Sequence, residues 1–168
     1  MEHKQKLRYQ TPARTFSQAL PIGNGSLGAM IYGGLPVYQC SLNLDTLWSG
    51  RPGRNEHVAV SEETRQRVRR LLKEKKYFEA QKLVQERMTG ESYNESYVGA
   101  GFLTIAFADL GNLQGYQRTL DLDCAAAKTT CQVQGKALSI QSFVSGADGV
   151  FVTDILSEVP LEFTAGVD

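Results

Sequence analysis

The side chains with the chemistry of a binding site gather in one short segment of this sequence. Asn43, Asp45 and Trp48 lie within six consecutive residues, and Trp48 is the only tryptophan of the chain. An aromatic ring beside amide and carboxylate groups suits a hydroxyl-rich ring, which needs an apolar stacking surface and fixed hydrogen-bond partners. The structural alternative is that Asp45 and Thr46 fix a turn and that Trp48 fills the core. Both interpretations can hold together.

A glycine-rich motif precedes this segment. Residues 23–28, Gly-Asn-Gly-Ser-Leu-Gly, match the pattern G-x-G-x-x-G. A dinucleotide site of this type needs a strand before the motif and a helix after it, so that pyrophosphate lies at the helix N-terminus. Pro21 comes before the motif, and an alternating, strand-like segment comes after it. We therefore predict that these glycines form turns with positive φ or close backbone approaches.

The other titratable residues form no catalytic or metal-binding pattern. Asp121 and Asp123 alternate with leucines, which is typical of the polar face of a strand. His3 and His57 are far apart and have no cysteine or carboxylate at ligand spacing. No Ser, Cys or His is arranged as a nucleophile with its base. We predict no metal, no cofactor and no catalytic residue within these residues.

The composition disfavours several functional classes. The 168 residues carry 18 Lys+Arg and 18 Asp+Glu, so no net charge attracts nucleic acid or an anionic membrane. No apolar run approaches the roughly 20 residues of a membrane-spanning helix, and no apolar signal-peptide region follows Met1. We expect no nucleic-acid or membrane partner and a cytoplasmic location. The three cysteines, Cys40, Cys124 and Cys131, are typical of buried thiols in a reducing compartment.

The length of 168 residues is typical of a single domain, and the hydrophobic periodicity predicts that this domain is mainly β. Short strand-like segments separated by Gly, Asn and Pro turns predict an antiparallel β-sandwich. The segments are residues 27–32, 37–42, 102–107, 116–122, 127–133, 138–144, 150–156 and 161–165. Residues 1–20 show little periodicity, and we expect an irregular lead-in there.

A small αα-hairpin is predicted as an insertion at about residues 61–89. Ser61 is a suitable N-cap for a helix over residues 61–74, and the glutamates that follow it favour the positive end of the helix dipole. A second helix is expected from about Tyr77 to Met88, with Gly90 as its stop signal.

Several of these segments together resemble the N-terminal domain of glycoside hydrolase family 95, the bacterial and plant α-L-fucosidase group. The resemblance runs in order from about residue 16 to the C-terminus, and its first two blocks are highly specific. The blocks are residues 19–34 (ALPIGNGSLGAMIYGG), 42–43 with 45–50 (LN and DTLWSG), 71–72 with Tyr77 and 79–81 (LL, Y, EAQ), and 116–118 with 120–122 (YQR and LDL). Leu44 stands where the family usually has an acidic residue, and residues 98–102 stand where it usually has a Pro-Leu-Gly-Asp block.

The resemblance implies a supersandwich-like N-terminal β-sandwich, followed by a linker, an (α/α)6 catalytic barrel and a C-terminal β domain. Family members hydrolyse terminal α-linked L-fucose, or related galactose-type sugars, with inversion. Their catalytic Glu, Asn and Asp side chains lie in the barrel. Residues 1–168 would then be an incomplete sandwich domain that lacks the barrel and is inactive alone. The implied partner is a fucosylated oligosaccharide or glycan bound through the catalytic domain, with Asn43, Asp45 and Trp48 as substrate-pocket or interdomain residues.

Two other functions stay open from the sequence. A free-standing carbohydrate-binding or interaction module would bind fucosides, and Trp48→Ala would weaken that binding. A non-functional gene fragment would expose edge strands and be poorly soluble.

Overall fold

The computed structural model describes residues 5–50, 59–89 and 96–168. The chain divides into two compact units, of which the first comprises Met1–Leu47 together with Val98–Asp168. The second unit is Trp48–Tyr97. The strands of the two sheets lie in the first unit and the α-helices in the second.

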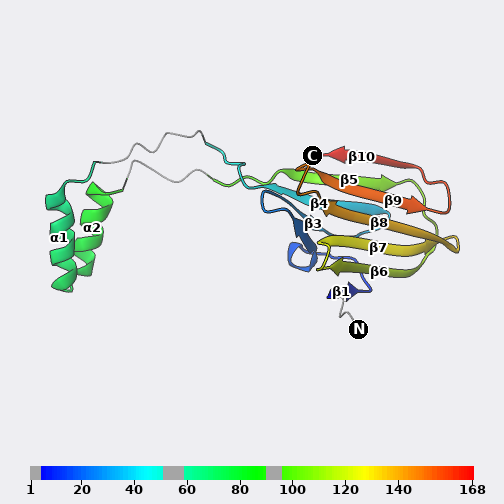
Figure 1. Ribbon diagram of the computed structural model, residues 1–168, viewed down its shortest axis with the longest axis horizontal. Helices are drawn as coiled ribbons and strands as arrows, with labels where there is room; N and C mark the ends of the chain where they lie inside the picture. The colour runs from blue at the N-terminus through cyan, green and yellow to red at the C-terminus, as the bar shows by residue number, and fades with distance from the viewer. Residues whose placement is uncertain (1–4, 51–58, 90–95) are drawn as a thin grey trace. The chain divides into compact units, whose positions relative to one another are not determined.

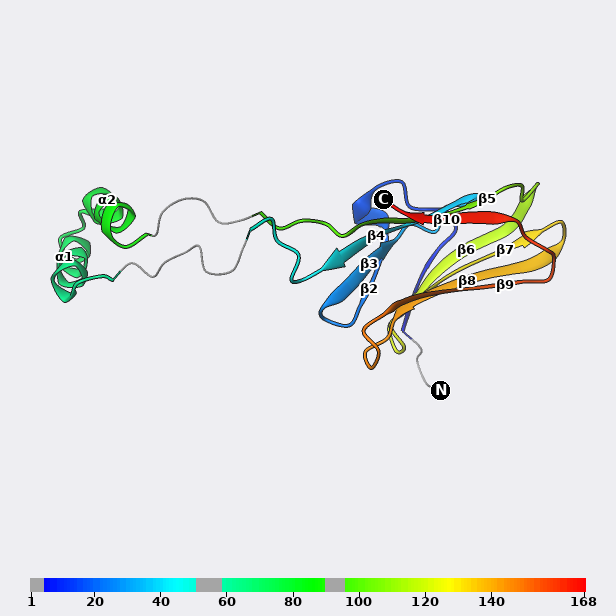
Figure 2. The same ribbon diagram turned by 90° about the horizontal axis from the view of Figure 1, so that it is seen from above.

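The first unit is a sandwich of two antiparallel five-stranded sheets, which Figure 2 shows as two layers. One sheet has the strand order β1-β6-β7-β8-β9 and the other the order β10-β5-β4-β3-β2 (Figure 1). The strands are β1 (Lys6–Tyr9), β2 (Leu20–Gly23), β3 (Leu27–Ile31), β4 (Val37–Leu44), β5 (Gly101–Phe107), β6 (Leu113–Asp121), β7 (Ala126–Val133), β8 (Lys136–Val144), β9 (Phe151–Ser157) and β10 (Phe163–Val167). The mainly β class and the antiparallel sandwich expected from the sequence are confirmed.

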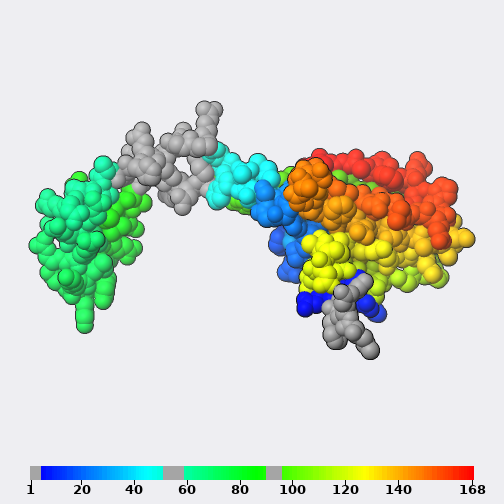
Figure 3. Space-filling model, in the orientation of Figure 1, coloured from blue at the N-terminus to red at the C-terminus, as the bar shows by residue number. Residues whose placement is uncertain are grey.

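The hydrophobic core lies between the two sheets. Alternate residues of β7 and β8 are buried, as the two-residue period of a strand requires. Leu138 and Ile140 of β8 belong to one buried cluster with Tyr38 and Cys40 of β4, which come from the opposite sheet. The other face of the β1-β6-β7-β8-β9 sheet lies on the surface, where Figure 3 shows its yellow and orange strands.

The second unit contains the expected helical hairpin. It consists of α1 (Glu62–Lys73) and α2 (Tyr77–Arg87), which match the predicted insertion at about residues 61–89. Ser61 is the N-cap of α1, because its hydroxyl accepts a hydrogen bond from the Thr64 backbone N–H. Neither helix of the described residues is long and apolar enough to cross a membrane. The predicted stop at Gly90 lies outside the described residues.

The expectation of an irregular lead-in over residues 1–20 is wrong. β1 pairs with β6 in the register Lys6↔Asp121 to Tyr9↔Arg118, and β2 begins at Leu20 and pairs with β3. A four-residue strand is too short to show a clear alternation of apolar and polar residues, and the proline at position 21 disfavours the prediction of a strand there. Proline is tolerated here because β2 is the edge strand of its sheet, so one side of the strand needs no N–H donor.

The expectation of buried thiols is correct for two of the three cysteines. Cys40 and Cys131 are buried, whereas Cys124 is exposed. Cys124 lies in the turn between β6 and β7, outside either sheet. Burial raises the pKa of the Cys40 thiol to about 12 and also raises the pKa of Cys131.

Alkylation of the folded chain with iodoacetamide is therefore expected to modify Cys124 well before Cys40 and Cys131. The thiolate is the reactive form, and burial both blocks access and keeps the two core thiols protonated. The raised pKa of the Cys40 thiol also makes the stability of the fold depend on pH. The protonated thiol stabilises the folded state fully below the ordinary thiol pKa, and this stabilisation is lost as the pH rises toward the folded-state pKa. Peptide mass mapping measures the order of labelling, and a Cys124→Ser variant should stay unlabelled until it unfolds. Equal labelling of all three cysteines in the folded chain would contradict this burial pattern.

Candidate functional site

The glycine-rich motif forms the turn of the β2–β3 hairpin. The side-chain Oδ1 of Asn24 accepts hydrogen bonds from the backbone N–H of Ser26 at 3.1 Å and of Leu27 at 2.9 Å, and Gly25 has φ +97°. The Asn24 Nδ2 donates to the Ser145 carbonyl oxygen at 3.1 Å, which ties this turn to the end of β8. A strand, β2, precedes the motif, contrary to our expectation. The element that follows it is the strand β3, as expected, so the helix that a dinucleotide site needs is missing at this position. The prediction of a turn glycine with positive φ is confirmed for Gly25, and the prediction of a close backbone approach is confirmed for Gly23, where an added Cβ would lie 3.0 Å from the Leu27 carbonyl oxygen. Gly28 is a strand residue of β3 and has neither feature.

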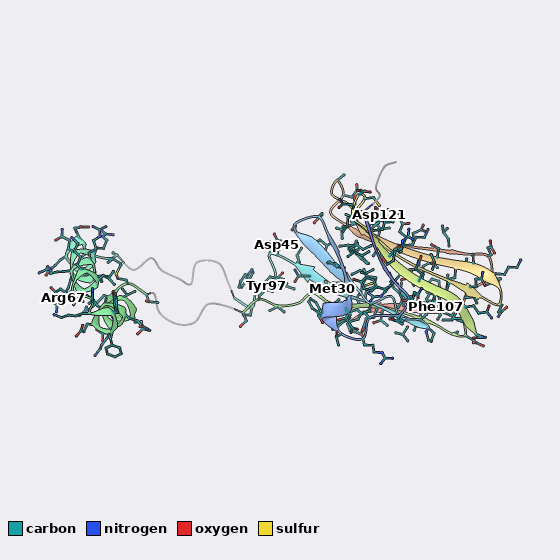
Figure 4. All side chains as sticks on the ribbon, turned by 90° about the horizontal axis from the view of Figure 1, so that it is seen from below. Met30, Asp45, Arg67, Tyr97, Phe107 and Asp121 are labelled. Carbon is teal, nitrogen blue, oxygen red and sulfur yellow. The ribbon has the colours of Figure 1, made fainter. Side chains whose placement is uncertain are left out.

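Asp45 lies against this hairpin turn, at the end of β4. The Ser26 hydroxyl donates to Asp45 Oδ1 at 2.8 Å, and the Asp45 backbone N–H donates to the Ser26 carbonyl oxygen at 3.0 Å. Figure 4 shows Asp45 at the end of the sandwich where the hairpin turns, whereas Phe107 lies at the other end. These contacts confirm that Asp45 fixes a turn. The residue is exposed.

Asn43 lies on β4, two residues before Asp45, which belongs to the turn that follows the strand. It pairs in register with Gly28 of β3, and its side chain is exposed. The end of β4 and the turn after it therefore carry an exposed amide-bearing residue and an exposed carboxylate-bearing residue, two positions apart. Both kinds of group can form hydrogen bonds with hydroxyl groups.

Trp48 belongs to the second unit, where it pairs with Tyr97. The two residues form an antiparallel bridge, and their ring centroids lie 5.1 Å apart at an interplanar angle of 75°, an edge-to-face arrangement. Backbone bonds extend this pairing, since the Ser49 N–H donates to the Ser96 carbonyl oxygen at 2.9 Å and the Ser96 N–H donates to the Ser49 hydroxyl at 3.0 Å. The Trp48 side chain remains 52% exposed, so the alternative that it fills the core is wrong.

The structure therefore places the three predicted residues in two sets. Asn43 and Asp45 lie in the sandwich unit, and Trp48 lies in the unit of Trp48–Tyr97. Sequence reasoning missed two of their partners, Ser26 and Tyr97. Ser26 is part of the glycine-rich block and lies 19 residues from Asp45, so the block itself was a signal. Tyr97 is separated from Trp48 by the helical insertion, and nothing in its local sequence indicates the pairing.

No group of three or more His, Cys, Asp or Glu side chains within residues 5–50, 59–89 and 96–168 is placed to hold a metal ion. His3 and His57, which the sequence analysis considered for such a site, both lie outside the described residues.

Comparison with known protein families supports a glycosidase domain. The sequence model of the family described as glycosyl hydrolase family 65, N-terminal domain, matches residues 7–168. The chain belongs to this family. The match begins within β1 and includes all other strands of the sandwich, so this glycosidase N-terminal domain coincides with the first unit and its helical insertion.

Two individual relatives agree with this family membership. The protein named alpha-L-fucosidase 2 of Arabidopsis thaliana is 33% identical over 168 residues, which cover 97% of this chain and 20% of that protein. The protein named probable alpha-fucosidase A of Aspergillus niger is 29% identical over 153 residues, which cover 89% of this chain and 19% of that protein. The glycosidase N-terminal domain thus spans about a fifth of the length of the relatives it matches.

Proposed function

We propose that this chain is the N-terminal β-sandwich domain of a longer α-L-fucosidase of glycoside hydrolase family 95. The observation that carries the proposal is the 33% identity to a plant protein named alpha-L-fucosidase 2, over 97% of this chain. The family 95 sequence blocks support it, because one of the two highly specific blocks, residues 19–34, contains most of the β2–β3 hairpin against which Asp45 is fixed. The proposed substrate is a glycan with terminal α-linked L-fucose or a related galactose-type sugar.

In this proposal the sandwich supports catalysis and does not perform it. An (α/α)6 barrel elsewhere in the polypeptide provides the catalytic acid and the base. The acid protonates the glycosidic oxygen of the leaving group, and the base activates a water molecule that attacks the anomeric carbon from the opposite face and inverts it. Residues 1–168 are then an incomplete sandwich domain that is inactive alone. We place the whole enzyme in the cytoplasm, which cell fractionation tests.

Asn43, Asp45 and Trp48 have supporting roles in the proposal. The exposed Asn43 and Asp45 side chains present an amide and a carboxylate from a rigid β4 end, and the Ser26 hydroxyl fixes the carboxylate by a 2.8 Å hydrogen bond. Trp48 presents an exposed ring that is oriented by its edge-to-face contact with Tyr97. These groups contribute to the rim of the sugar pocket or to the contact with the barrel.

The test compares hydrolysis of an aryl α-L-fucoside by the complete reading frame and by the 168-residue chain. The complete enzyme is expected to release fucose as the β-anomer, and the isolated chain is expected to show no turnover. Trp48→Ala and Asp45→Asn in the complete enzyme are expected to lower kcat/KM by about ten-fold each, which corresponds to about 1.4 kcal/mol of transition-state stabilisation.

Matched controls separate these effects from damage to the fold. Leu156→Ala and Asp154→Asn change exposed side chains of β9, and should leave kcat/KM within error of the parent. Fucoside turnover by the isolated chain would refute the supporting role. A complete enzyme that hydrolyses other glycosides but no fucoside or galactoside would refute the substrate assignment.

A second candidate function, a free-standing carbohydrate-binding module, is favoured by the half-exposed Trp48 ring alone. It requires the isolated chain to bind L-fucose or a fucosyl oligosaccharide at millimolar concentration, with weaker binding by Trp48→Ala. Titration calorimetry that detects no binding removes this candidate and leaves the enzyme-domain proposal in place.

A further inference from the structure

A cavity of about 490 Å³ lies at the N-terminal edge of the sandwich, away from Asn43 and Asp45. Figure 1 shows the edge concerned, where β1 runs beside β6. Its walls come from β1, the segment before β2, the start of β2, and β6. The lining residues are Leu7, Tyr9, Thr11, Pro12, Ser17, Gln18, Ala19, Leu20, Pro21 and Arg118. The volume lies within the range of sites that hold small molecules, roughly 300–1,000 Å³.

Arg118 of β6 is the cation of this cavity. The residue is only 3% exposed, and its guanidinium lies over the Tyr9 ring at 4.5 Å from the centroid. Its Nε donates to the Thr11 carbonyl oxygen at 2.7 Å, and its Nη1 donates to the Gln18 carbonyl oxygen at 2.7 Å. Both acceptors are neutral backbone groups, so these bonds orient the guanidinium without neutralising its charge.

The Nη2 of Arg118 is the guanidinium nitrogen that remains available for a ligand. Within the described part of the chain, Nη2 has no protein acceptor, and no carboxylate lies within ion-pairing distance of Arg118. No fully buried side-chain nitrogen among the described residues lacks a partner, so Nη2 retains accessible surface, and Arg118 is one of the residues that line the cavity. A buried cation without a counter-ion is costly, and an anion held by its free edge offsets that cost.

Charge and shape narrow the class of anion. Arg118 is the only cation among the residues that line the cavity, so one negative charge balances the site and a doubly charged phosphate exceeds it. A carboxylate can accept a charge-assisted hydrogen bond from the Nη2 that has no protein acceptor. The remaining walls combine apolar faces, such as Leu7 and Pro12, with the hydroxyls of Thr11 and Ser17. Such walls suit a ring that has both C–H faces and hydroxyl groups.

We propose that this cavity is a binding site for a sugar acid, in which the single carboxylate of a hexuronate pairs with Arg118. Tyr9 holds the guanidinium from one side, and Thr11 and Gln18 fix its orientation, so the cation is pre-organised before the ligand arrives. The ligand of this cavity differs from a fucoside by its charge.

The test titrates the 168-residue chain with D-galacturonate and, as a matched neutral sugar, D-galactose. Galacturonate is expected to bind with millimolar affinity, and galactose about ten-fold more weakly or not at all. Protein NMR should place the shift changes at Leu7, Tyr9 and Arg118. Because Arg118 also holds backbone carbonyls, its replacement can unfold the chain, and a rim variant is the safer probe.

Leu7→Glu is that rim variant, since Leu7 is 43% exposed on β1 and lines the cavity. The added carboxylate should repel the ligand and lower its affinity at least about ten-fold. Leu7→Gln has the same shape without the charge, and Leu156→Glu places the same charge on β9 at the opposite edge of the sheet; both should bind like the parent.

Three outcomes would overturn the proposal. Absence of galacturonate binding at tens of millimolar would remove the site. Equal affinity for galacturonate and galactose would remove the role of Arg118. Equal affinity for acetate and galacturonate would show a simple anion site and would refute the sugar acid as ligand.

Discussion

Replacing Tyr38 with alanine is expected to lower the free energy of unfolding by about 3–5 kcal/mol, the usual cost of removing a large aromatic side chain from a core. Tyr38 is the largest of the fully buried side chains, at 0% exposure, and it lies in the cluster that both sheets share. The substitution leaves a void between the sheets. It also removes the Tyr38 Oη, which lies 3.0 Å from the Ser142 Oγ of β8.

The Tyr38–Ser142 contact is the start of a hydrogen-bonded chain between the sheets. The Ser142 hydroxyl also lies 3.0 Å from the Thr153 Oγ1 of β9, so the three hydroxyl groups join β4, β8 and β9. Burial strongly raises the pKa of Tyr38, which keeps its phenol protonated and able to donate. A buried hydroxyl without a partner would cost about 1–3 kcal/mol, so the chain makes these polar groups compatible with the core.

Tyr38→Phe is the matched control, because it retains the ring and removes only the hydroxyl. Its expected cost is about 1 kcal/mol, since Ser142 still has Thr153 as a partner. Urea unfolding followed by circular dichroism measures all variants. A double-mutant cycle with Ser142→Ala isolates the coupling between the two hydroxyls. If Tyr38→Ala costs no more than Tyr38→Phe, the ring does not pack in the core as the structure describes.

The sandwich could be predicted from the sequence because its strands carry their burial pattern locally. β7 alternates buried and accessible residues from Ala127 to Val133, and β8 does so from Leu138 to Ser142; their turn contains Gly135 at φ +76°. The sequence signals of the helical hairpin are equally local, because Ser61 and the two glutamates after it mark where α1 begins. Such signals lie within a few residues of one another, so one sequence is sufficient to detect them.

The N-terminal edge could not be predicted, because the contacts that order it are distant in sequence. Arg118 holds the carbonyl oxygens of Thr11 and Gln18 over separations of 107 and 100 residues. The exposed, four-residue β1 has no buried face that would give it a periodic pattern. Its order depends on Arg118 and on pairing with β6, where Lys6 forms a 2.6 Å ion pair with Asp121. Local sequence patterns could not predict the proposed sugar-acid cavity either, because Arg118 is distant in sequence from the other residues that line it.

The sequence indicated which residues to consider for the candidate site, but it did not indicate how they are arranged or which partners they have. Asp45 was expected to fix a turn, and the turn that it fixes belongs to the distant glycine block through Ser26. Trp48 was expected to fill the core in the structural alternative, but its ring lies half exposed beside Tyr97. Residue types indicate chemistry, whereas the partner of each group depends on which strands the fold brings together.

Gly33→Ala is expected to destabilise the sandwich by about 2–5 kcal/mol, because two separate costs add at this position. The first is backbone strain, since Gly33 has φ +69°. The second is steric, because an added Cβ would lie 2.9 Å from the Thr129 Oγ1 and 3.0 Å from the Tyr116 Oη. The Gly33 carbonyl oxygen accepts a 2.6 Å hydrogen bond from that same tyrosine hydroxyl, so the Cβ would also disturb a contact between the β3–β4 loop and β6.

Gly149→Ala separates the two costs, because Gly149 has a similar φ of +65° and open space where its Cβ would lie. The Gly149→Ala variant should lose only the free energy that backbone strain costs, about 1–2 kcal/mol of the free energy of unfolding. The excess cost of Gly33→Ala, about 1–3 kcal/mol, then measures the crowding around its Cβ. The Cδ of Arg118 lies 3.3 Å from the same point, so the variant should also shift the guanidinium and weaken galacturonate binding. Equal destabilisation by the two substitutions would show that the Gly33 loop moves freely, and the tight packing behind the Arg118 cavity would then be refuted.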